Sequence, residues 1–234
     1  MNLVVVTGGS RGLGAAVCEY YGARGWTIVE FSRSAPHPYS VSLDLSDPRL
    51  AADVFAKTLE PLAARAVSEV VAVNNAAMLG PVGPVERSSL AAIEAHLAVG
   101  VTSAIAFARA FVRAFQEHDC PKTLVNISSG AAAGGLAGWS LYCASKAALE
   151  NYIRAVALEQ AARTPPIRAI SVNPGVMDTD MQATVRSSPV EDFPTVERFV
   201  RLKEEGRLAP PARVASRLAE IVASRPEPGG VYSA

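Results

Sequence analysis

The sequence has few cysteines, and their arrangement argues against two kinds of stabilising site. Cys18, Cys120 and Cys143 are odd in number and widely spaced, and no CxxC pair occurs. A disulfide framework or a structural zinc site is therefore not expected. His37, His118 and Cys143 form no metal-ligand set with neighbouring residues, so we expect no metal.

The sequence also lacks net charge, with 22 basic and 22 acidic residues among 234. This balance gives no electrostatic reason to expect nucleic acid or an anionic membrane as a partner. Half of the residues are hydrophobic, which suffices for a large core. We find no basic leader before the apolar segment at 3–6, and no apolar run as long as the ~18 residues of a membrane helix. We therefore expect a cytoplasmic location.

Apolar runs that predict strands alternate with segments of helical periodicity. Strands are expected at 3–6, 26–32, 41–43, 69–74, 123–128, 167–173 and 230–232. Helices are expected after the glycines at 8–14, over 47–65 with Ser46 as N-cap, over 87–118, and around 149–156. This alternation predicts an α/β fold: a Rossmann-like, doubly wound parallel sheet with helices on both faces.

We expect one domain over residues 1–234, because the sequence holds no internal repeat and no low-complexity linker. The segment at about 176–208 interrupts the alternation of strands and helices. It is more polar, carries mixed charge and contains Pro189 and Pro194. We expect this segment to form a lid over a ligand site.

A glycine-rich turn separates the first expected strand from the first helix, and it reads Thr7-Gly8-Gly9-Ser10-Arg11-Gly12-Leu13-Gly14. Glycines let the backbone approach a phosphate, and the helix N-terminus behind them offers free N–H groups. An ordinary turn would also contain glycines, and the TGxxxGxG spacing differs from the GxGxxG fingerprint. The place of the turn between strand and helix favours nucleotide binding.

This spacing resembles the short-chain dehydrogenase/reductase family, and further matches follow in order along nearly the whole chain. They are Asp44 after the third strand, Asn74-Asn75-Ala76-Ala77 after the fourth, Ser128-Ser129 after the fifth, Tyr142 and Lys146 in a YxxxK motif, and Asn173-Pro174-Gly175 after the sixth. The resemblance implies an oxidoreductase that binds a nicotinamide cofactor. The implied cofactor contacts are Gly8, Ser10, Arg11, Gly12, Leu13, Gly14, Ser32, Arg33, Asp44, Leu45, Asn75, Ala76, Tyr142, Lys146, Pro174, Gly175, Val176 and Thr179.

The end of the second strand predicts which nicotinamide cofactor binds. An acidic residue there would bind the ribose 2′-hydroxyl of NAD, whereas a basic residue would pair with the 2′-phosphate of NADP. Ser32 stands where NAD-dependent relatives carry Asp, and Arg33 follows it. Arg33 and Arg11 favour NADP(H), because a guanidinium group stays charged and donates paired hydrogen bonds, although both could be ordinary surface arginines. Glu30 could oppose this assignment, but strand alternation points it away from Arg33.

Tyr142 and Lys146 are one helical turn apart, so they share a helix face. A nearby ammonium group favours the phenolate and would lower the pKa of the tyrosine from ~10. Tyr142 is therefore the expected proton donor. Ser129, thirteen residues earlier, is expected to stabilise charge on the substrate oxygen. Ser128 is the competing candidate, and it could instead satisfy backbone groups at the strand end.

One feature of the family is missing. Members often carry an Asn in the long helix after the fourth strand, where it holds a water in a proton relay, and Gly100 stands at that place. Either water and backbone replace the relay, or His96 or Thr102 substitutes for it. We interpret His96 as an ordinary helix residue.

The segments at 138–143, 174–182, 186–188 and 197–199 resemble the branch of the family with benzil and sepiapterin reductases. That branch reduces vicinal dicarbonyls and related ketones. Ser129, Trp139, Met177 and Met181 are the expected substrate-pocket residues, because Met and Trp form an adaptable apolar surface. Plain core packing would explain Trp139 and the methionines as well.

Two other functions stay open. A redox sensor could hold NADPH without turnover, but it would not need the pair of Tyr142 and Lys146. An oxidising hydroxysteroid or sugar dehydrogenase is disfavoured by Arg33, because NADPH pools generally favour reduction. The resemblance also implies pairing through the long helices, and the alanine-rich face at 104–114 would permit close approach. We expect a homodimer or homotetramer.

Overall fold

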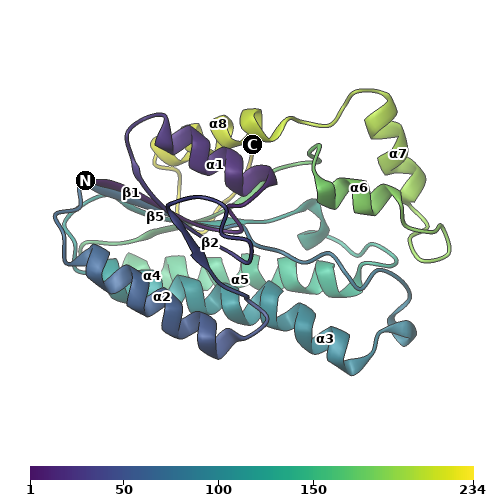
Figure 1. The fold of residues 1–234 in the computed structure, drawn as a ribbon, viewed down its shortest axis with the longest axis horizontal. Helices are drawn as coiled ribbons and strands as arrows, with labels where there is room; N and C mark the ends of the chain where they lie inside the picture. The colour runs from purple at the N-terminus through teal and green to yellow at the C-terminus, as the bar shows by residue number, and fades with distance from the viewer.

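The computed structural model describes residues 1–234 and is built around one parallel sheet (Figure 1). Its strands are β1 (Asn2–Thr7), β2 (Thr27–Ser32), β3 (Ser40–Ser42), β4 (Glu69–Asn74), β5 (Lys122–Ile127), β6 (Arg168–Asn173) and β7 (Val231–Ser233). They lie in the order β3-β2-β1-β4-β5-β6-β7, and all neighbours are parallel. The central strands are buried on both faces, which explains their continuous apolar runs.

Helices cover both faces of this sheet. One face carries α1 (Gly12–Gly22) and α8 (Pro211–Ala223), and the other carries α2 (Pro48–Ala63), α4 (Ser103–Phe115) and α5 (Ser140–Ala161) (Figure 1). A separate apolar cluster fills the space on each side of the sheet. The predicted doubly wound α/β fold is therefore confirmed.

Two helix predictions were wrong in detail. The helix expected over 47–65 begins at Pro48, and its N-cap is Asp47 rather than Ser46. The carboxylate of Asp47 accepts hydrogen bonds from the N–H groups of Arg49 and Leu50, at 3.0 and 3.1 Å. The helix expected over 87–118 consists of α3 (Leu90–Leu97), a π-helical turn at Ala98–Thr102, and α4.

The helical stretch Leu90–Phe115 is long and apolar enough to cross a membrane by length and composition alone. This corrects the expectation that no segment reaches that length. Only 28% of its most apolar window is buried within the chain. One such helix is weak evidence for a membrane, because helices of water-soluble proteins pass the same criterion.

The segment expected as a lid contains α6 (Asp180–Arg186) and α7 (Val196–Glu204). Both helices lie beyond the carboxyl ends of the strands, where the glycine turn also lies (Figure 1). An ion pair of 2.6 Å joins Lys203 on α7 to Asp178 at the start of the segment. The chain returns to the main body through a parallel bridge between Met177 and Ala209.

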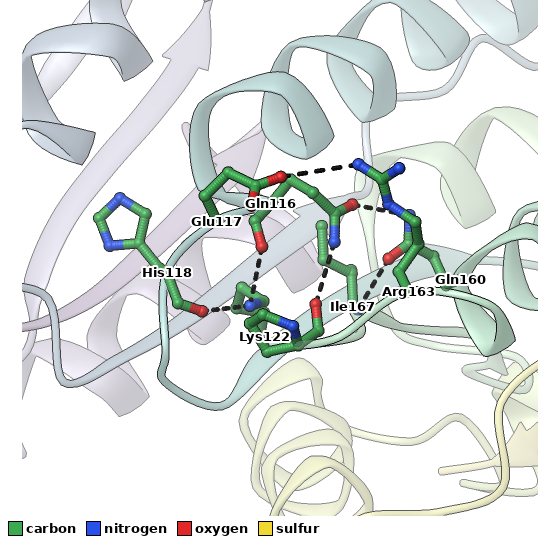
Figure 2. A network of polar contacts seen from close by, with 8 residues as sticks. Gln116, Glu117, His118, Lys122, Gln160, Arg163 and Ile167 are labelled. Carbon is green, nitrogen blue, oxygen red and sulfur yellow. Dashed lines mark hydrogen bonds and ion pairs between the residues drawn. The ribbon is translucent and has the colours of Figure 1, made fainter.

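A polar network closes the opposite end of the sheet (Figure 2). The ammonium group of Lys122, on β5, donates to the backbone oxygens of Gln116 and His118 just after α4. The side chain of Gln160 donates to that of Gln116 and accepts from the N–H of Ile167, both at 2.9 Å. Buried Lys122 thus faces the negative end of a helix dipole. A cleft of about 800 Å³ beside this network contains none of the predicted site residues.

Candidate active site

The glycine turn between β1 and α1 presents backbone donors to a ligand. Arg11 occupies the N-cap position of α1 without a side-chain cap, so the first N–H groups of the helix have no side-chain acceptor. Gly8 and Gly12 have φ angles of 70° and 56°, which favour glycine. A Cβ atom on Gly14 would lie 2.2 Å from the carbonyl oxygen of Gly8. The uncapped N–H groups at the start of α1 fit a nucleotide phosphate, whereas the N–H groups of Gly8 and Gly9 already donate to Phe31 and Glu30.

The end of β4 braces this turn. The amide nitrogen of the Asn75 side chain donates to the carbonyl oxygens of Thr7 and Gly8, at 2.9 and 3.0 Å. The hydroxyl oxygen of Thr7 accepts from the N–H groups of Asn75 and Ala76, at 3.0 and 3.1 Å. Both amide hydrogens of Asn75 are thus directed at the glycine turn, and Asn75 fixes its shape.

Glu30, at the end of β2, is fully buried beneath the same turn. Its carboxylate accepts from the N–H of Gly9 at 3.1 Å and from the hydroxyl of Ser32 at 3.0 Å. The Ser32 oxygen in turn accepts from the N–H of Ala35 at 3.1 Å. Arg33 is exposed. The carboxylate is therefore turned inward, away from the rim where Arg33 lies.

The segment expected as a lid reaches back to the glycine turn. Arg11 forms an ion pair of 3.0 Å with Asp180 in the first turn of α6. The methyl carbon of Thr179 lies 3.5 Å from the position that a Cβ of Gly12 would take. The hydroxyl of Thr179 caps α6 by accepting from the N–H of Gln182 at 3.4 Å. Thr179 and Asp180 therefore lie over the turn.

The other predicted cofactor residues lie in the loops at the carboxyl ends of their strands. Asp44 is exposed after β3, and a hydrogen bond from the N–H of Ser46 lowers the pKa of its carboxyl group. Gly175 follows β6 with a φ of 68°, and its N–H donates to the Asn173 side chain at 3.0 Å. The predicted residues Ser10, Leu45, Pro174 and Val176 lie in these loops and the glycine turn, whereas Leu13 lies in the first turn of α1 and is buried in the apolar cluster beneath it.

Tyr142 and Lys146 are both buried on one face of α5. The ammonium group of Lys146 donates to the carbonyl oxygen of Ile127 at 2.7 Å and lies 5.7 Å from the centre of the Tyr142 ring. Burial lowers the pKa of Lys146 to about 8. Burial also raises the pKa of Tyr142, while the polar Ser129 side chain nearby lowers it. The net upward shift is opposite to the expected one, because the lysine points to Ile127 rather than to the phenol.

The structure separates the two candidate serines. The hydroxyl of Ser128 donates to Glu150 on α5 at 2.5 Å, and Glu150 also pairs with Arg154 at 3.0 Å. Ser129 instead lies beside the phenol of Tyr142. Its hydroxyl oxygen also accepts from the N–H of Ala131 at 3.2 Å. Ser129, Tyr142 and Lys146 therefore converge, and Ser128 belongs to a neighbouring contact with Glu150.

An aromatic cluster adjoins Tyr142. Trp139 stacks on Phe193 with ring centres 4.4 Å apart, and its ring lies edge-on to Tyr142 at 5.5 Å. Phe199 completes the cluster, 5.4 Å from Trp139, and Met181 packs against it. Phe193 was missed in the sequence, where only its aromatic character within a polar segment marked it, and Phe199 was noted in the segment 197–199 but not as a site residue.

Met177 was predicted to line the substrate pocket together with Met181, and this stays a prediction, because the two side chains pack against different clusters. The side chain of Met177 packs against the apolar cluster under α1 and α8, on the other face of the sheet from α5. The bridge with Ala209 holds its backbone there. Sequence proximity to Met181 did not imply a shared environment, because the chain turns into α6 between the two residues.

The position of the missing relay Asn lies beside α5. Gly100 is buried in the π-helical turn, and a Cβ there would lie 3.3 Å from the Cβ of Ser145 and 3.6 Å from His96 Nε2. His96 is fully buried, with Nδ1 2.7 Å from the Gly80 oxygen and Nε2 3.3 Å from the Ser145 hydroxyl. His96 is thus not an ordinary helix residue, and Thr102 is exposed.

Known proteins resemble this chain over its whole length. The family model described as short chain dehydrogenase matches residues 2–189. A benzil reductase ((S)-benzoin forming) of Bacillus subtilis is 34% identical over 99% of this chain and 98% of its own length. A sepiapterin reductase of Meriones unguiculatus is 31% identical over 93% of this chain and 90% of its own.

The solved structure of the KRED1-Pglu enzyme has a TM-score of 0.83 and 26% sequence identity, and the match covers 99% of this chain and 100% of that one. It supports the fold, and the family model and the two reductases support the relationship in sequence. Together with the glycine turn and the convergence of Ser129, Tyr142 and Lys146, these matches show that the chain belongs to the short-chain dehydrogenase family of oxidoreductases.

Proposed function

We propose that this protein is an NADPH-dependent carbonyl reductase that converts a ketone or vicinal dicarbonyl to an alcohol. The observation that carries the proposal is the convergence of Ser129, Tyr142 and Lys146 beside both an aromatic cluster and a phosphate cradle. An acid, a second hydroxyl group and apolar surroundings are what reduction of a carbonyl group needs.

A bound nicotinamide would supply the hydride. Tyr142 donates a proton to the substrate oxygen, and the raised pKa keeps its phenol protonated at neutral pH. Ser129 donates to the same oxygen and stabilises the negative charge that grows there. Lys146 holds the ribose hydroxyls with hydrogens that Ile127 does not use.

The inward position of Glu30 and the exposure of Arg33 support NADP(H) over NAD(H). Arg33 and Arg11 would pair with the 2′-phosphate. Arg11 would then leave or share its ion pair with Asp180, an exchange that costs little because both side chains are largely exposed.

The apolar, aromatic surroundings of Tyr142 favour an apolar or aromatic carbonyl substrate. Relatives named benzil reductase and sepiapterin reductase are consistent with such a substrate. The intact acid also distinguishes this proposal from a sensor that binds NADPH without turnover.

A homodimer or homotetramer is proposed as well, through the helical stretch Leu90–Phe115. Leu90 and Leu97 on this stretch are 69% and 38% exposed, and such an assembly would cover them. The cytoplasmic location expected from the sequence stays a prediction.

Replacement of Tyr142 by Phe is expected to lower kcat by roughly 10²-fold or more, because the acid is lost while the ring stays. The Kd for NADPH, measured by cofactor fluorescence, is expected to change little. Tyr152→Phe, further along α5, is the matched control. Near-normal turnover by Tyr142→Phe would contradict the role of this residue as proton donor.

Replacement of Arg33 by Ala is expected to raise the KM for NADPH by roughly tenfold or more, since a hydrogen bond to a charged group is worth ~1.5–3 kcal/mol. The KM for NADH should change little, because NADH lacks the 2′-phosphate. Arg49→Ala, at an exposed position of α2, serves as control. A wild-type enzyme that prefers NADH would refute the cofactor assignment.

The pH profile of reduction is expected to fall as the pH rises through about 8, where buried Lys146 loses its proton. The pKa of Lys146 in the folded protein lies below the usual value of 10.5, so the ammonium form predominates only below about pH 8. Lys146→Met should be slower and should lack this limb of the kcat profile. If kcat fell in the same way above about pH 8 in wild type and in Lys146→Met, the decrease would belong to another titrating group.

A panel of diketones tests the proposed substrate class through NADPH oxidation. We expect kcat/KM for an aryl diketone such as benzil to exceed that for 2,3-butanedione by roughly tenfold. This ratio corresponds to the free energy of about one or two aromatic contacts. Phe193→Leu removes the ring that stacks on Trp139 and should lower the ratio of the two kcat/KM values. Tyr20→Leu, on α1, should leave this ratio unchanged. Equal kcat/KM values for both diketones would show that the aromatic cluster does not select the substrate.

A further inference from the structure

The space beside Gly100 is already occupied by other side chains. A side chain at this position would meet Ser145 at 3.3 Å and His96 at 3.6 Å from its first carbon. Contacts of 3.3 Å are tight for a Cβ atom, so one of the neighbours would have to move. Gly100 therefore does not leave a hole in the molecule, because His96 and Ser145 fill the room of the expected Asn.

His96 joins three parts of the chain that are far apart in sequence. It lies on α3, its Nδ1 contacts the Gly80 oxygen in the loop after β4, and its Nε2 contacts Ser145 on α5. A carbonyl oxygen can only accept, so Nδ1 carries a hydrogen. In the neutral ring Nε2 is then an acceptor, and it shares the single hydroxyl hydrogen of Ser145 with the backbone oxygen of Tyr142.

Each of the two contacts ends next to the candidate active site. The hydroxyl of Ser145 lies 3.0 Å from the backbone oxygen of Tyr142, in the first turn of α5. Gly80 follows Leu79, which packs in the same cluster as Trp139 and Tyr142. One imidazole therefore contacts both the turn that carries the proposed acid and the loop that forms part of the pocket wall.

We propose that His96 is a positioning residue with two separable effects. It occupies the space of the relay Asn and supports the neighbouring segments, but it does not transfer a proton. Its contact with Ser145 fixes the turn of α5 that bears Tyr142, and its contact with Gly80 fixes the loop at Leu79. No contact links His96 to the phenol or to the Lys146 ammonium group. The proposal rests on the proposed reductase function.

Two amide variants separate the two contacts. In His96→Asn the amide nitrogen takes the place of Nδ1 and keeps the bond to Gly80, but the side chain is too short for Ser145. In His96→Gln the amide reaches the place of Nε2 and keeps the bond to Ser145. His96→Leu fills the space and makes neither bond. Glu94→Gln, exposed on the same helix, is the control.

The measurements are kcat and KM for benzil at saturating NADPH, with the melting temperature of each variant. We expect His96→Asn to lower kcat by roughly tenfold with little change in KM, since a small misplacement of the acid costs rate. We expect His96→Gln to raise KM by roughly threefold to tenfold with kcat nearly unchanged, because the wall rather than the acid has moved. His96→Leu should show both effects.

Ser145→Ala provides a second test that changes few atoms. It should lower kcat as His96→Asn does, and the double variant should be no slower than either single variant, because both remove one interaction. The proposal is overturned if His96→Leu keeps wild-type kcat and KM, if the three His96 variants share one pattern, or if the losses in the double variant add. Turnover retained by Tyr142→Phe would instead overturn the reductase mechanism on which it rests.

Discussion

The contact between Asn75 and the glycine turn is the constraint on which the rest of the site depends. Two hydrogen bonds hold the end of β4 against Thr7 and Gly8, and Gly14 packs against the Gly8 oxygen so closely that no side chain fits. Because β1 and β4 are adjacent in the sheet, this brace fixes the phosphate cradle relative to the loop that leads to Gly80. The proposed nucleotide site and the loop before Gly80 thus share one support.

Helix α5 supplies the second support, through residues spaced by one turn. Tyr142, Lys146 and Glu150 share the buried face that packs on the end of β5. Lys146 bonds to the Ile127 backbone and Glu150 to the Ser128 side chain, so two successive turns of the helix are held against the segment that leads to Ser129. The sheet order β4-β5-β6 then brings Ser129 beside the other loops at the carboxyl ends of the strands.

Local patterns made most of the fold and part of the site predictable. Continuous apolar runs located the seven strands within one or two residues, and the spacing of Tyr142 and Lys146 correctly predicted that both lie on one face of a helix. Contacts between distant segments were not predictable in this way. Tertiary packing determines the surroundings of Phe193, Met177 and His96, and the spacing of residues along the chain does not encode such contacts.

Burial explains the charge state of the site better than the sequence pattern did. A lysine one turn from a tyrosine suggested a lowered phenol pKa, but the ammonium points to a carbonyl and burial dominates both groups. Burial disfavours the charged form, so it pushes Tyr142 towards neutral phenol and Lys146 towards neutral amine. A protonated phenol is the form required to donate a proton during reduction. Donation leaves a phenolate, however, and the same low-polarity surroundings disfavour that charged product, so the step requires a nearby positive charge to stabilise it.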